Sequence, residues 1–323
     1  MIAGLHDVQI PAGAQAQAVA DLWHWLLPIC TLVFIAVVIA LLLALRRAPR
    51  VAIDAAPDIE SLSQREPKVA RRVVGSAVGL STILLLILLA ASVLTDRRLA
   101  QLPLANALHI ELIGYQWWWE ARYDDRDPSR IFITANELHV PVGRPVIVSL
   151  VGADVIHSFW VPSLAGKKDL IPGRDQTISF RADHPGVYRG QCAEFCGYQH
   201  AKMALYVIAD RADDYEQWAA RQRRPAATPA SEEAKRGQDL FLARSCAMCH
   251  AINGTTAQAR HAPDLTHVAS RMTLAAGALE NTPSNRAAWM LDPQQFKPGT
   301  KMPAENLAPQ ELAALNAFLG SLQ

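Results

Sequence analysis

Residues 191–203 read QCAEFCGYQHAKM and hold two cysteines four positions apart, a histidine four positions further on and a methionine three after that. Thiolate, imidazole and thioether groups are soft ligands that select copper or zinc over magnesium or calcium. Strand-like segments flank this stretch, so its candidate ligands come from one loop: Cys192, Cys196, His200 and Met203. The sequence therefore predicts a metal site in a loop between two strands.

The methionine helps to choose the metal. Structural zinc sites use four cysteine or histidine ligands and rarely recruit a thioether, whereas electron-transfer copper sites do. His157, in the strand-like run DVIHSFWVPS, is the best candidate for a further ligand. Two thiolates, two imidazoles and one thioether are more ligands than one copper ion uses, so two copper ions sharing the thiolates would fit.

A second motif, CAMCH at residues 246–250, has the spacing of a covalent haem attachment site. Cys246 and Cys249 would bond the porphyrin vinyl groups, and His250 would be the proximal iron ligand. Disulfides within the two cysteine pairs are the alternative in an oxidising compartment. The adjoining histidine and methionine residues favour the two redox sites. The fifth cysteine, Cys30, lies in an apolar segment and is assigned no function.

Two apolar segments, residues 22–45 and 73–95, contain no Lys, Arg, Asp or Glu. About 20 apolar residues cross the hydrocarbon core of a membrane, so both segments are predicted to span it. The first starts too late, and lacks a preceding basic residue, for an ordinary secretory signal. Residues 46–72 carry seven basic residues and the segment before them none, which places this loop in the cytoplasm and both chain ends outside.

The rest of the chain divides into a β-rich and a helical part. Short aromatic and β-branched runs with turn signals over about residues 105–210 predict an all-β sandwich or barrel. Residues 212–222 predict a short helix, and a proline-containing linker follows. Ser231 is suited to cap a helix that begins with Glu232 and Glu233. A closing helix is predicted from one apolar face: Leu312, Leu315, Phe318, Leu319 and Leu322.

The segments GYQWWWEARY, DVIHSFWVPSLAGKKDLIPGR and GVYRGQCAEFCGYQHAKM together resemble cytochrome c oxidase subunit II over about residues 20–215. In that family two spans precede a cupredoxin-like Greek-key barrel with a dinuclear copper centre, CuA. The resemblance implies as ligands His157, Cys192, the backbone carbonyl of Glu194, Cys196, His200 and Met203. It also implies that both sulfurs bridge the two ions, and that the Glu194 carboxylate reaches a magnesium ion at the border with the catalytic subunit.

The C-terminal part resembles a class I cytochrome c fused to the oxidase subunit, as in caa-type oxidases. The resemblance implies that Pro263 supports His250 through its backbone carbonyl and that Met302, in the loop PGTKMP, is the sixth iron ligand. Met272 and Met290 lie in helix-like stretches, where a methionine usually packs in the core. Met248 lies between the two cysteines and faces the wrong way to bind the iron. We expect the other histidines to be surface residues: His6, His24, His109, His139, His184, His261 and His267.

Trp117, Trp118 and Trp119 would alternate between the two faces of one strand. Core packing and an aromatic belt at the membrane surface explain such residues without a redox role. The resemblance places Trp117 at the surface where electrons enter, above the copper pair, and leaves the other two as structural.

Glu66 is the nearest counterpart of a glutamate that admits protons in some oxidases, although the surrounding EPKVARRVV departs from that motif.

The expected organisation is an extracytoplasmic segment 1–21, spans 22–45 and 73–95 around a cytoplasmic loop 46–72, a copper domain 96–222, a linker 223–231 and a cytochrome c domain 232–323. A net charge of +1 gives no case for nucleic-acid binding. The resemblance implies an electron-input subunit in a bacterial inner membrane, with cytochrome c as donor and catalytic subunits I and III as partners among the lipids. Quinol-oxidising relatives lack the copper ligands that this chain retains.

Three other functions remain open at this stage. The chain could serve the same role in a CuA-containing nitric oxide reductase, because the difference lies in the catalytic partner. It could be a stand-alone membrane-tethered electron shuttle. A copper-storage or metallochaperone module is disfavoured by the haem motif, since storage needs no electron relay.

Overall fold

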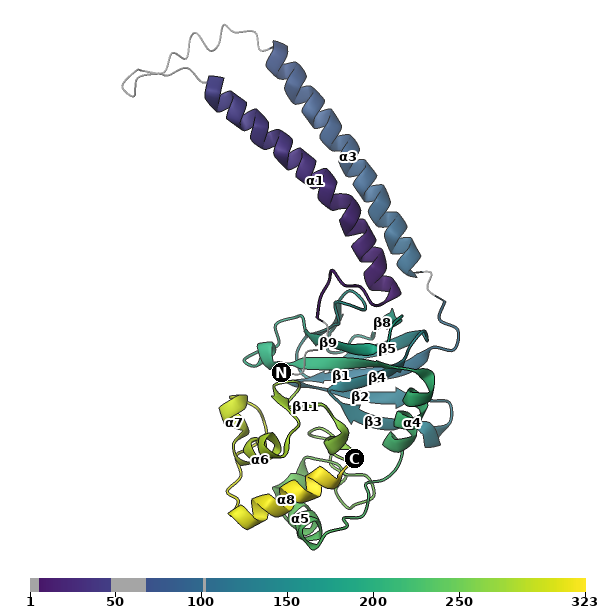
Figure 1. The fold of residues 1–323 in the computed structure, drawn as a ribbon, viewed down its shortest axis with the longest axis vertical. Coiled ribbons are helices and arrows are strands. Elements are labelled where there is room, and N and C mark those ends of the chain that lie inside the picture. The colour runs from purple at the N-terminus through teal and green to yellow at the C-terminus, as the bar shows by residue number, and fades with distance from the viewer. Residues whose placement is uncertain (1–5, 48–67, 101–102) are drawn as a thin grey trace, which may run out of the picture. The chain divides into compact units, whose positions relative to one another are not determined.

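The computed structural model describes residues 6–47, 68–100 and 103–323 (Figure 1). Glu66 lies outside the described residues. The chain forms two units, one of Met1–Gln17 with Pro103–Gln323 and one of Ala18–Leu102. Each unit is described by itself.

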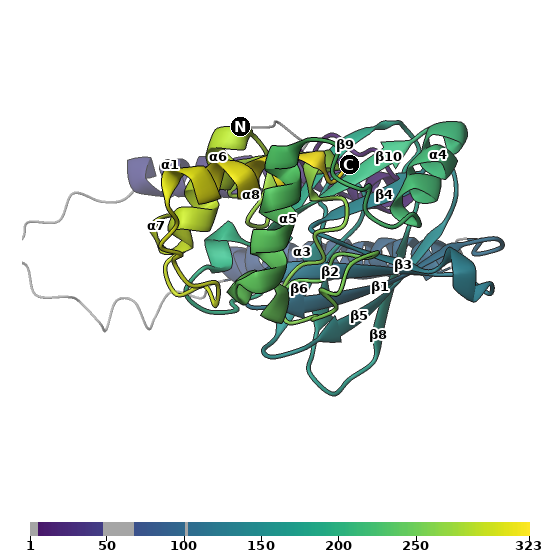
Figure 2. The same ribbon diagram turned by 90° about the horizontal axis from the view of Figure 1, so that it is seen from below.

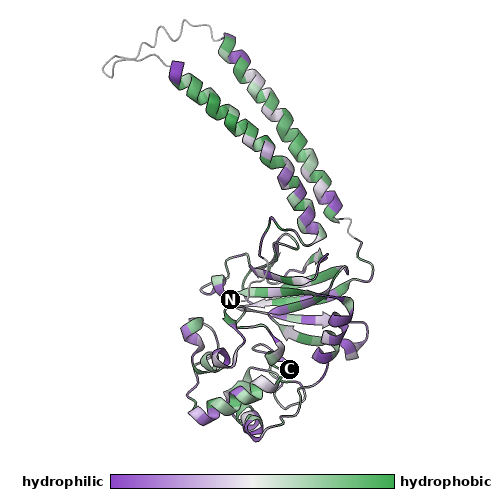
Figure 3. Ribbon diagram, viewed as in Figure 1, coloured by the Kyte–Doolittle hydropathy of each residue, from purple (hydrophilic) through white to green (hydrophobic). Residues whose placement is uncertain are grey.

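Two long helices, α1 (Ala14–Arg47) and α3 (Lys68–Ala100), contain the predicted spans. Figure 3 shows their apolar character along most of their length. The most apolar 18-residue window of each helix buries none of its residues within the chain, unlike the core helix of a soluble protein. By length and composition, both helices are able to cross a membrane.

The β-rich part is a sandwich of two five-stranded sheets, ordered β3-β2-β1-β5-β8 and β4-β10-β9-β6-β7. Its strands are β1 (Leu108–Tyr115), β2 (Trp118–Asp124), β3 (Phe132–Ala135), β4 (Glu137–Pro141), β5 (Val146–Gly152), β6 (His157–Trp160), β7 (Lys168–Leu170), β8 (Gln176–Phe180), β9 (Gly186–Cys192) and β10 (Ala204–Asp210). The predicted all-β block is therefore confirmed, with β7 as an additional short strand.

The core of the sandwich follows from the period of two along each strand. Leu108, Ile110 and Leu112 of β1 are buried while their neighbours are more exposed, and β5 has the same alternation. These two central strands pair in parallel, Ile110 opposite Val148, so their apolar side chains face the same interior. The sandwich is thus a rigid frame from which loops can project.

Two details of the predicted strands are wrong. Trp117 is not in a strand, because β1 ends at Tyr115, β2 starts at Trp118, and the register pairs those two residues across a tight turn. The run RIFITANELHVPVG, one of the strand-like runs in the predicted block, is not one strand but two, β3 and β4, which lie in different sheets. They are separated at Asn136, whose φ of 64° redirects the chain and whose side chain accepts the Trp119 amide.

The C-terminal part is helical, as predicted, and lies beside the sandwich in both ribbon views (Figures 1 and 2). Helix α4 (Ala212–Gln222) precedes it, and α5 (Glu232–Ala243) starts at Ser231, whose hydroxyl accepts the Ala234 amide. Its remaining elements are η3 (Ser245–Met248), η4 (Val268–Ser270), α6 (Pro283–Leu291), α7 (Pro293–Phe296), α8 (Pro309–Ser321) and a small hairpin, β11 (Thr273–Leu274) and β12 (Leu279–Glu280), that the sequence did not predict.

Two histidines predicted to be surface residues are not. His267 is buried, and both of its ring nitrogens contact carbonyl oxygens, Nδ1 that of Gln323 at 2.7 Å and Nε2 that of Arg224 at 3.0 Å. His139 is half-buried, stacks on Trp218 and pairs with Asp210. Both have satisfied structural environments, which an isolated histidine in a sequence does not reveal.

Gly237 controls how closely α5 approaches α8. A β-carbon at this position would lie 2.0 Å from the carbonyl oxygen of Ala314 and 2.7 Å from Cβ of Phe318. Backbone atoms cannot yield as a flexible side chain does, so the two helices have to separate to accept a methyl group.

We therefore expect Gly237→Ala to destabilise the helical part by about 3 kcal/mol or more. Thermal unfolding followed by helical circular dichroism measures this. Gly166→Ala, where a β-carbon meets nothing within 4 Å, is the matched control and should change the melting temperature little. Equal effects of the two variants would contradict the role given to Gly237.

Candidate functional site: two ligand clusters joined through Trp117

The first cluster lies where the β9–β10 loop meets the start of β6. Cys192 is the last residue of β9, and Cys196, His200 and Met203 follow before β10 begins. His157 comes from the first position of β6, rather than from the end of a strand as the sequence suggested, and β6 pairs with β9. This pairing is what joins His157 to a loop 35 residues later.

The predicted donor atoms converge on two sulfurs. Sγ of Cys192 and Sγ of Cys196 are 3.7 Å apart. The Cys192 sulfur lies 3.9 Å from Nδ1 of His157 and 3.2 Å from the Glu194 carbonyl oxygen. The Cys196 sulfur lies 3.6 Å from Nδ1 of His200 and 3.8 Å from Sδ of Met203. The structure therefore brings together all six groups implied by the resemblance.

A hydrogen bond at the edge of the cluster holds His157 in place. Nε2 of His157 lies 2.9 Å from Oδ1 of Asp154, which leaves Nδ1 directed at the sulfur. Burial opposes ionisation of Asp154, but hydrogen bonds from His157 and from the Gln116 and Val155 amides outweigh it and lower the pKa of this carboxyl. Such an outer partner fixes the tautomer and orientation of a metal-binding histidine.

The two thiols differ in acidity because they share one proton between them. A hydrogen bond from Cys196, with further ones from His157 and the backbone, lowers the pKa of Cys192 to about 4. The neighbouring thiolate and burial raise the pKa of Cys196. The surroundings of Cys192 therefore favour its thiolate form, which is the form that binds a metal.

The donor set fits a pair of soft metal ions better than the alternatives. A disulfide needs sulfurs about 2.05 Å apart, and those of Cys192 and Cys196 are free. A structural zinc site takes four ligands, whereas five side chains and a carbonyl converge here. His157, Cys192, Cys196 and Met203 are at most 2% exposed, so the thioether has no other environment than the cluster.

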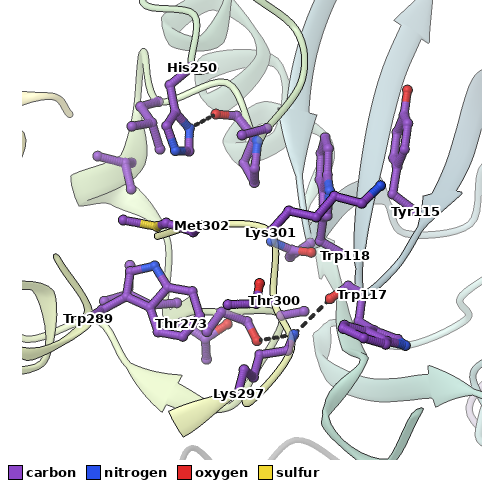
Figure 4. Close-up of a pocket in the computed structure, with 18 of the residues that line it drawn as sticks. Tyr115, Trp117, Trp118, His250, Thr273, Trp289, Lys297, Thr300, Lys301 and Met302 are labelled. Atoms are coloured by element: carbon purple, nitrogen blue, oxygen red, sulfur yellow. Dashed lines mark hydrogen bonds between the residues drawn. The ribbon is translucent and has the colours of Figure 1, made fainter. Parts of the chain in front are cut away.

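The second cluster lines a cavity in the helical part, where His250 and Met302 lie together with Cys246 and Cys249. An adjoining cavity, drawn in Figure 4, shares His250 and Met302 with it and is also lined by Trp117 and Lys297. Nδ1 of His250 lies 2.7 Å from the carbonyl oxygen of Pro263, which can only accept, so Nδ1 carries the proton. Burial lowers the pKa of His250. A neutral ring with Nε2 unprotonated is the form that binds iron.

The methionines separate by position. Met302, Met290 and Met248 line the cavity and Met272 does not, but Met248, within the haem-binding motif, is 68% exposed. Met302 is held by its loop, since the Gln294 amide donates to the carbonyls of Thr300 and Met302. Met290 is buried in the apolar core of the helical part, as its helical context predicted. The cavity thus offers one loop methionine and one core methionine opposite the haem-binding motif.

Trp117 lies between the two clusters. Its indole Nε1 donates to the Cys196 carbonyl at 3.0 Å, and the Gln116 amide donates to the same oxygen at 2.8 Å. A β-carbon on Gly197 would lie 3.3 Å from the indole, and one on Gly299 would lie 3.7 Å from it. Both glycines have positive φ, and each belongs to one of the ligand loops. Trp117 was expected at the surface, but it is only 8% exposed. The loop that carries Met302 covers it.

Further contacts join the sandwich to the helical part. The Glu137 carboxylate of β4 accepts the amides of Met272 at 2.7 Å and Thr273 at 3.1 Å. Nζ of Lys297 donates to the Trp117 carbonyl at 2.7 Å, and the Gln199 amide donates to the Pro298 carbonyl at 2.7 Å. Sequence reasoning missed Glu137 and Lys297, since neither lies in a motif.

Known proteins match both parts of the chain. A family model described as cytochrome c oxidase subunit II, periplasmic domain, matches residues 126–210, and one described as cytochrome c matches residues 234–323. The cytochrome c oxidase subunit 2 of Bacillus sp. (strain PS3) is 33% identical over 287 residues, which are 80% of this chain and 78% of that protein. This chain belongs to the cytochrome c oxidase subunit 2 family.

Other relatives agree with this assignment. The cytochrome c oxidase subunit 2 of Alkalihalophilus pseudofirmus is 38% identical over 219 residues, 68% of this chain. That of Bacillus subtilis is 35% identical over 229 residues, also 68% of this chain. The chain spans 62% and 63% of the length of these two relatives. The solved periplasmic domain of subunit II (CoxB) of Bradyrhizobium japonicum is 31% identical over 38% of this chain and 97% of that one, with a TM-score of 0.35.

The resemblance seen in the sequence is thus confirmed. A cupredoxin-like sandwich follows two apolar helices, and a cytochrome c domain is fused to its C-terminal end, as in caa-type oxidases. The family implies copper in the sandwich and haem c in the fused domain.

The stability of the contact between the two domains should depend on pH, because the carboxyl of Glu137 lies in this contact and is only 3% exposed. Burial, only partly offset by the Arg271 charge and the two amides, raises its pKa from 4.5 to about 7. The folded contact thus prefers the protonated carboxyl. Glu137 therefore contributes most to the free energy of unfolding below pH 4.5. This contribution, roughly 3 kcal/mol in total, is lost as the pH rises through 7.

Hydrogen exchange of the Met272 and Thr273 amides, corrected for intrinsic rates, should lose protection over this range in the wild type. Glu137→Gln, which keeps an acceptor but does not titrate, should abolish the pH dependence. Glu137→Ala should speed exchange by about tenfold or more at every pH, since two buried donors lose their acceptor. Identical profiles in all three proteins would exclude the contact.

Proposed function

We propose that this chain is the electron-input subunit of a haem–copper cytochrome c oxidase. The observation that carries the proposal is the position of Trp117, in contact with the loop of the first cluster and with the loop of the second. Outer-sphere electron transfer needs rigid, closely spaced sites rather than a nucleophile or general base. In this proposal cytochrome c is the donor, and a separate catalytic subunit reduces oxygen to water.

The first cluster holds the dinuclear copper centre CuA. Its ligands would be His157, Cys192, the Glu194 carbonyl, Cys196, His200 and Met203. The geometry supports this set because each other donor lies within 4 Å of one sulfur. The Glu194 carboxylate is partly exposed beside Lys167, and it would be the group that holds a magnesium ion at the border with subunit I.

The second cluster holds one covalent haem c. Cys246 and Cys249 would hold it through thioether bonds, and His250 and Met302 would bind its iron. When bound, the haem and the copper centre would supply one-electron redox chemistry, and the role of this chain would be to relay electrons toward subunit I. The contribution of the chain is to keep both sites fixed and largely dry, with Trp117 as the point where electrons enter the copper domain.

The setting in the cell follows from the charges around the helices. We place both termini and both redox domains on the outer, periplasmic side of a bacterial inner membrane. The basic loop between the two spans then faces the cytoplasm. Subunit III and membrane lipid complete the expected surroundings.

Substituting the two methionines tests both sites independently. Met203→Leu should alter the electron paramagnetic resonance signal of a mixed-valence copper pair and leave the visible haem spectrum unchanged. Met302→Leu should do the reverse, because each substitution removes one ligand from one cluster. Both spectra are recorded on the purified full chain.

The remaining methionines of the cytochrome domain serve as controls. Met272→Leu, outside the cavity, should leave both spectra unchanged, and so should Met290→Leu if Met302 is the ligand. A haem spectrum altered by Met290→Leu and not by Met302→Leu would reverse that assignment. Zinc in place of paired copper would contradict the proposal as a whole. Consumption of oxygen rather than nitric oxide by the purified complex distinguishes the oxidase from the reductase.

A further inference from the structure

Lys297 is a buried cation at the contact between the two redox domains. Its side chain is 3% exposed. Nζ donates to the Trp117 carbonyl of the copper domain at 2.7 Å and to the Ala275 carbonyl of the cytochrome domain at 3.0 Å (Figure 4). One side chain thus bridges two segments more than 150 residues apart.

This ammonium has no carboxylate within ion-pair distance in the described part of the chain. Burial without a counter-ion is unfavourable, and it lowers the pKa of Lys297 to about 7. The positive charge of Lys202 lowers the pKa of Lys297 further. An ammonium has three donors, and two carbonyls use only two of them. The site is therefore short of one anionic partner.

The cavity beside Lys297 has other unsatisfied polar groups. Lys297, Arg271 and Thr273 line the cavity drawn in Figure 4 together with Trp117, and this cavity shares His250 and Met302 with the one that Cys246 and Cys249 line. Nε of Arg271 and Oγ1 of Thr273 are buried and have no hydrogen-bond partner among the described residues. Buried polar groups are normally satisfied, so this end of the cavity is built for an anionic or strongly hydrogen-bonding group. The carboxylates of a haem are such groups.

We propose that Lys297 is a positioning residue for electron transfer between the domains, which bridges the carbonyl of Trp117 to a carboxylate of the bound haem. This rests on the function proposed above. The anionic partner supplied by the haem completes the ammonium's third hydrogen bond, and the charge-assisted bond fixes Trp117 relative to the porphyrin edge. The thioether edge, near the exposed Cys249 and Met248, is left for the external donor.

Two measurable consequences follow. A positive charge beside the haem stabilises its reduced form, so removing the charge lowers the midpoint potential of the haem. Freeing the Trp117 backbone loosens the contact between the two ligand loops, which slows electron transfer from haem to copper. If Lys297 merely filled space, removing its charge would not lower the midpoint potential of the haem. Keeping a positive charge at this position would then make no difference to the potential.

The experiment uses the full chain loaded with haem and copper, in Lys297→Met, Lys297→Gln and Lys297→Arg forms. Midpoint potentials come from optical redox titration, and transfer rates from copper reduction after rapid photoreduction of the haem. Lys297→Met should lower the potential and slow transfer by roughly tenfold to a hundredfold. Lys297→Arg, which keeps the charge and several donors, should restore the potential and most of the rate.

Lys235→Met is the matched control, since it removes a solvent-exposed lysine of the same domain. It should leave both quantities unchanged. If Lys297→Met does not fold, Lys297→Gln decides, because it retains a donor without the charge and should still lower the potential. An unchanged potential and rate in the folded, fully loaded variants would overturn the role of Lys297. Failure of the wild type to show the two cofactor signals would instead overturn the proposed function.

Discussion

The packing of Trp117 between two glycine-containing loops is the contact on which the arrangement of the two sites depends. The indole donates to the Cys196 carbonyl, and a β-carbon on Gly197 or on Gly299 would lie 3.3 Å or 3.7 Å from its ring. A side chain at Gly197 would come within 2.9 Å of the Gln116 amide, and its positive φ would strain any other residue. The loops that carry Cys196 and Met302 are therefore held at the separation of a single aromatic ring.

The sandwich makes this contact possible because it supplies fixed points on both sides. Pairing of β6 with β9 positions His157 against Cys192, and the β1–β2 turn presents Trp117 to the same loop. On the other side, the close approach of α5 and α8 over Gly237 holds the haem motif against the closing helix. Glu137 and Lys297 then connect the two frames through backbone groups, which cannot adopt other rotamers as side-chain partners can.

Buried charge at a contact between domains is a costly way to join them. Glu137 and Lys297 each lie on the contact with their pKa displaced toward neutrality, one upward and one downward. A purely apolar contact would be more stable but would tolerate sliding. Directed hydrogen bonds to specific carbonyls and amides fix one alignment, which matters more than stability where two redox sites must remain at a set distance.

The sequence by itself indicated the candidate ligands, since the cysteine, histidine and methionine spacings within residues 191–203 and 246–250 are local and their chemistry is carried by residue type. It also determined the two apolar helices and the change from strand to helical periodicity. Only the tertiary structure decided that Trp117 is covered, that RIFITANELHVPVG divides between sheets at Asn136, that His267 is buried, and that Glu137 and Lys297 meet the partner domain. These depend on which segments pack together over long separations, and a side chain's partners across such a distance leave no periodicity or spacing in the chain.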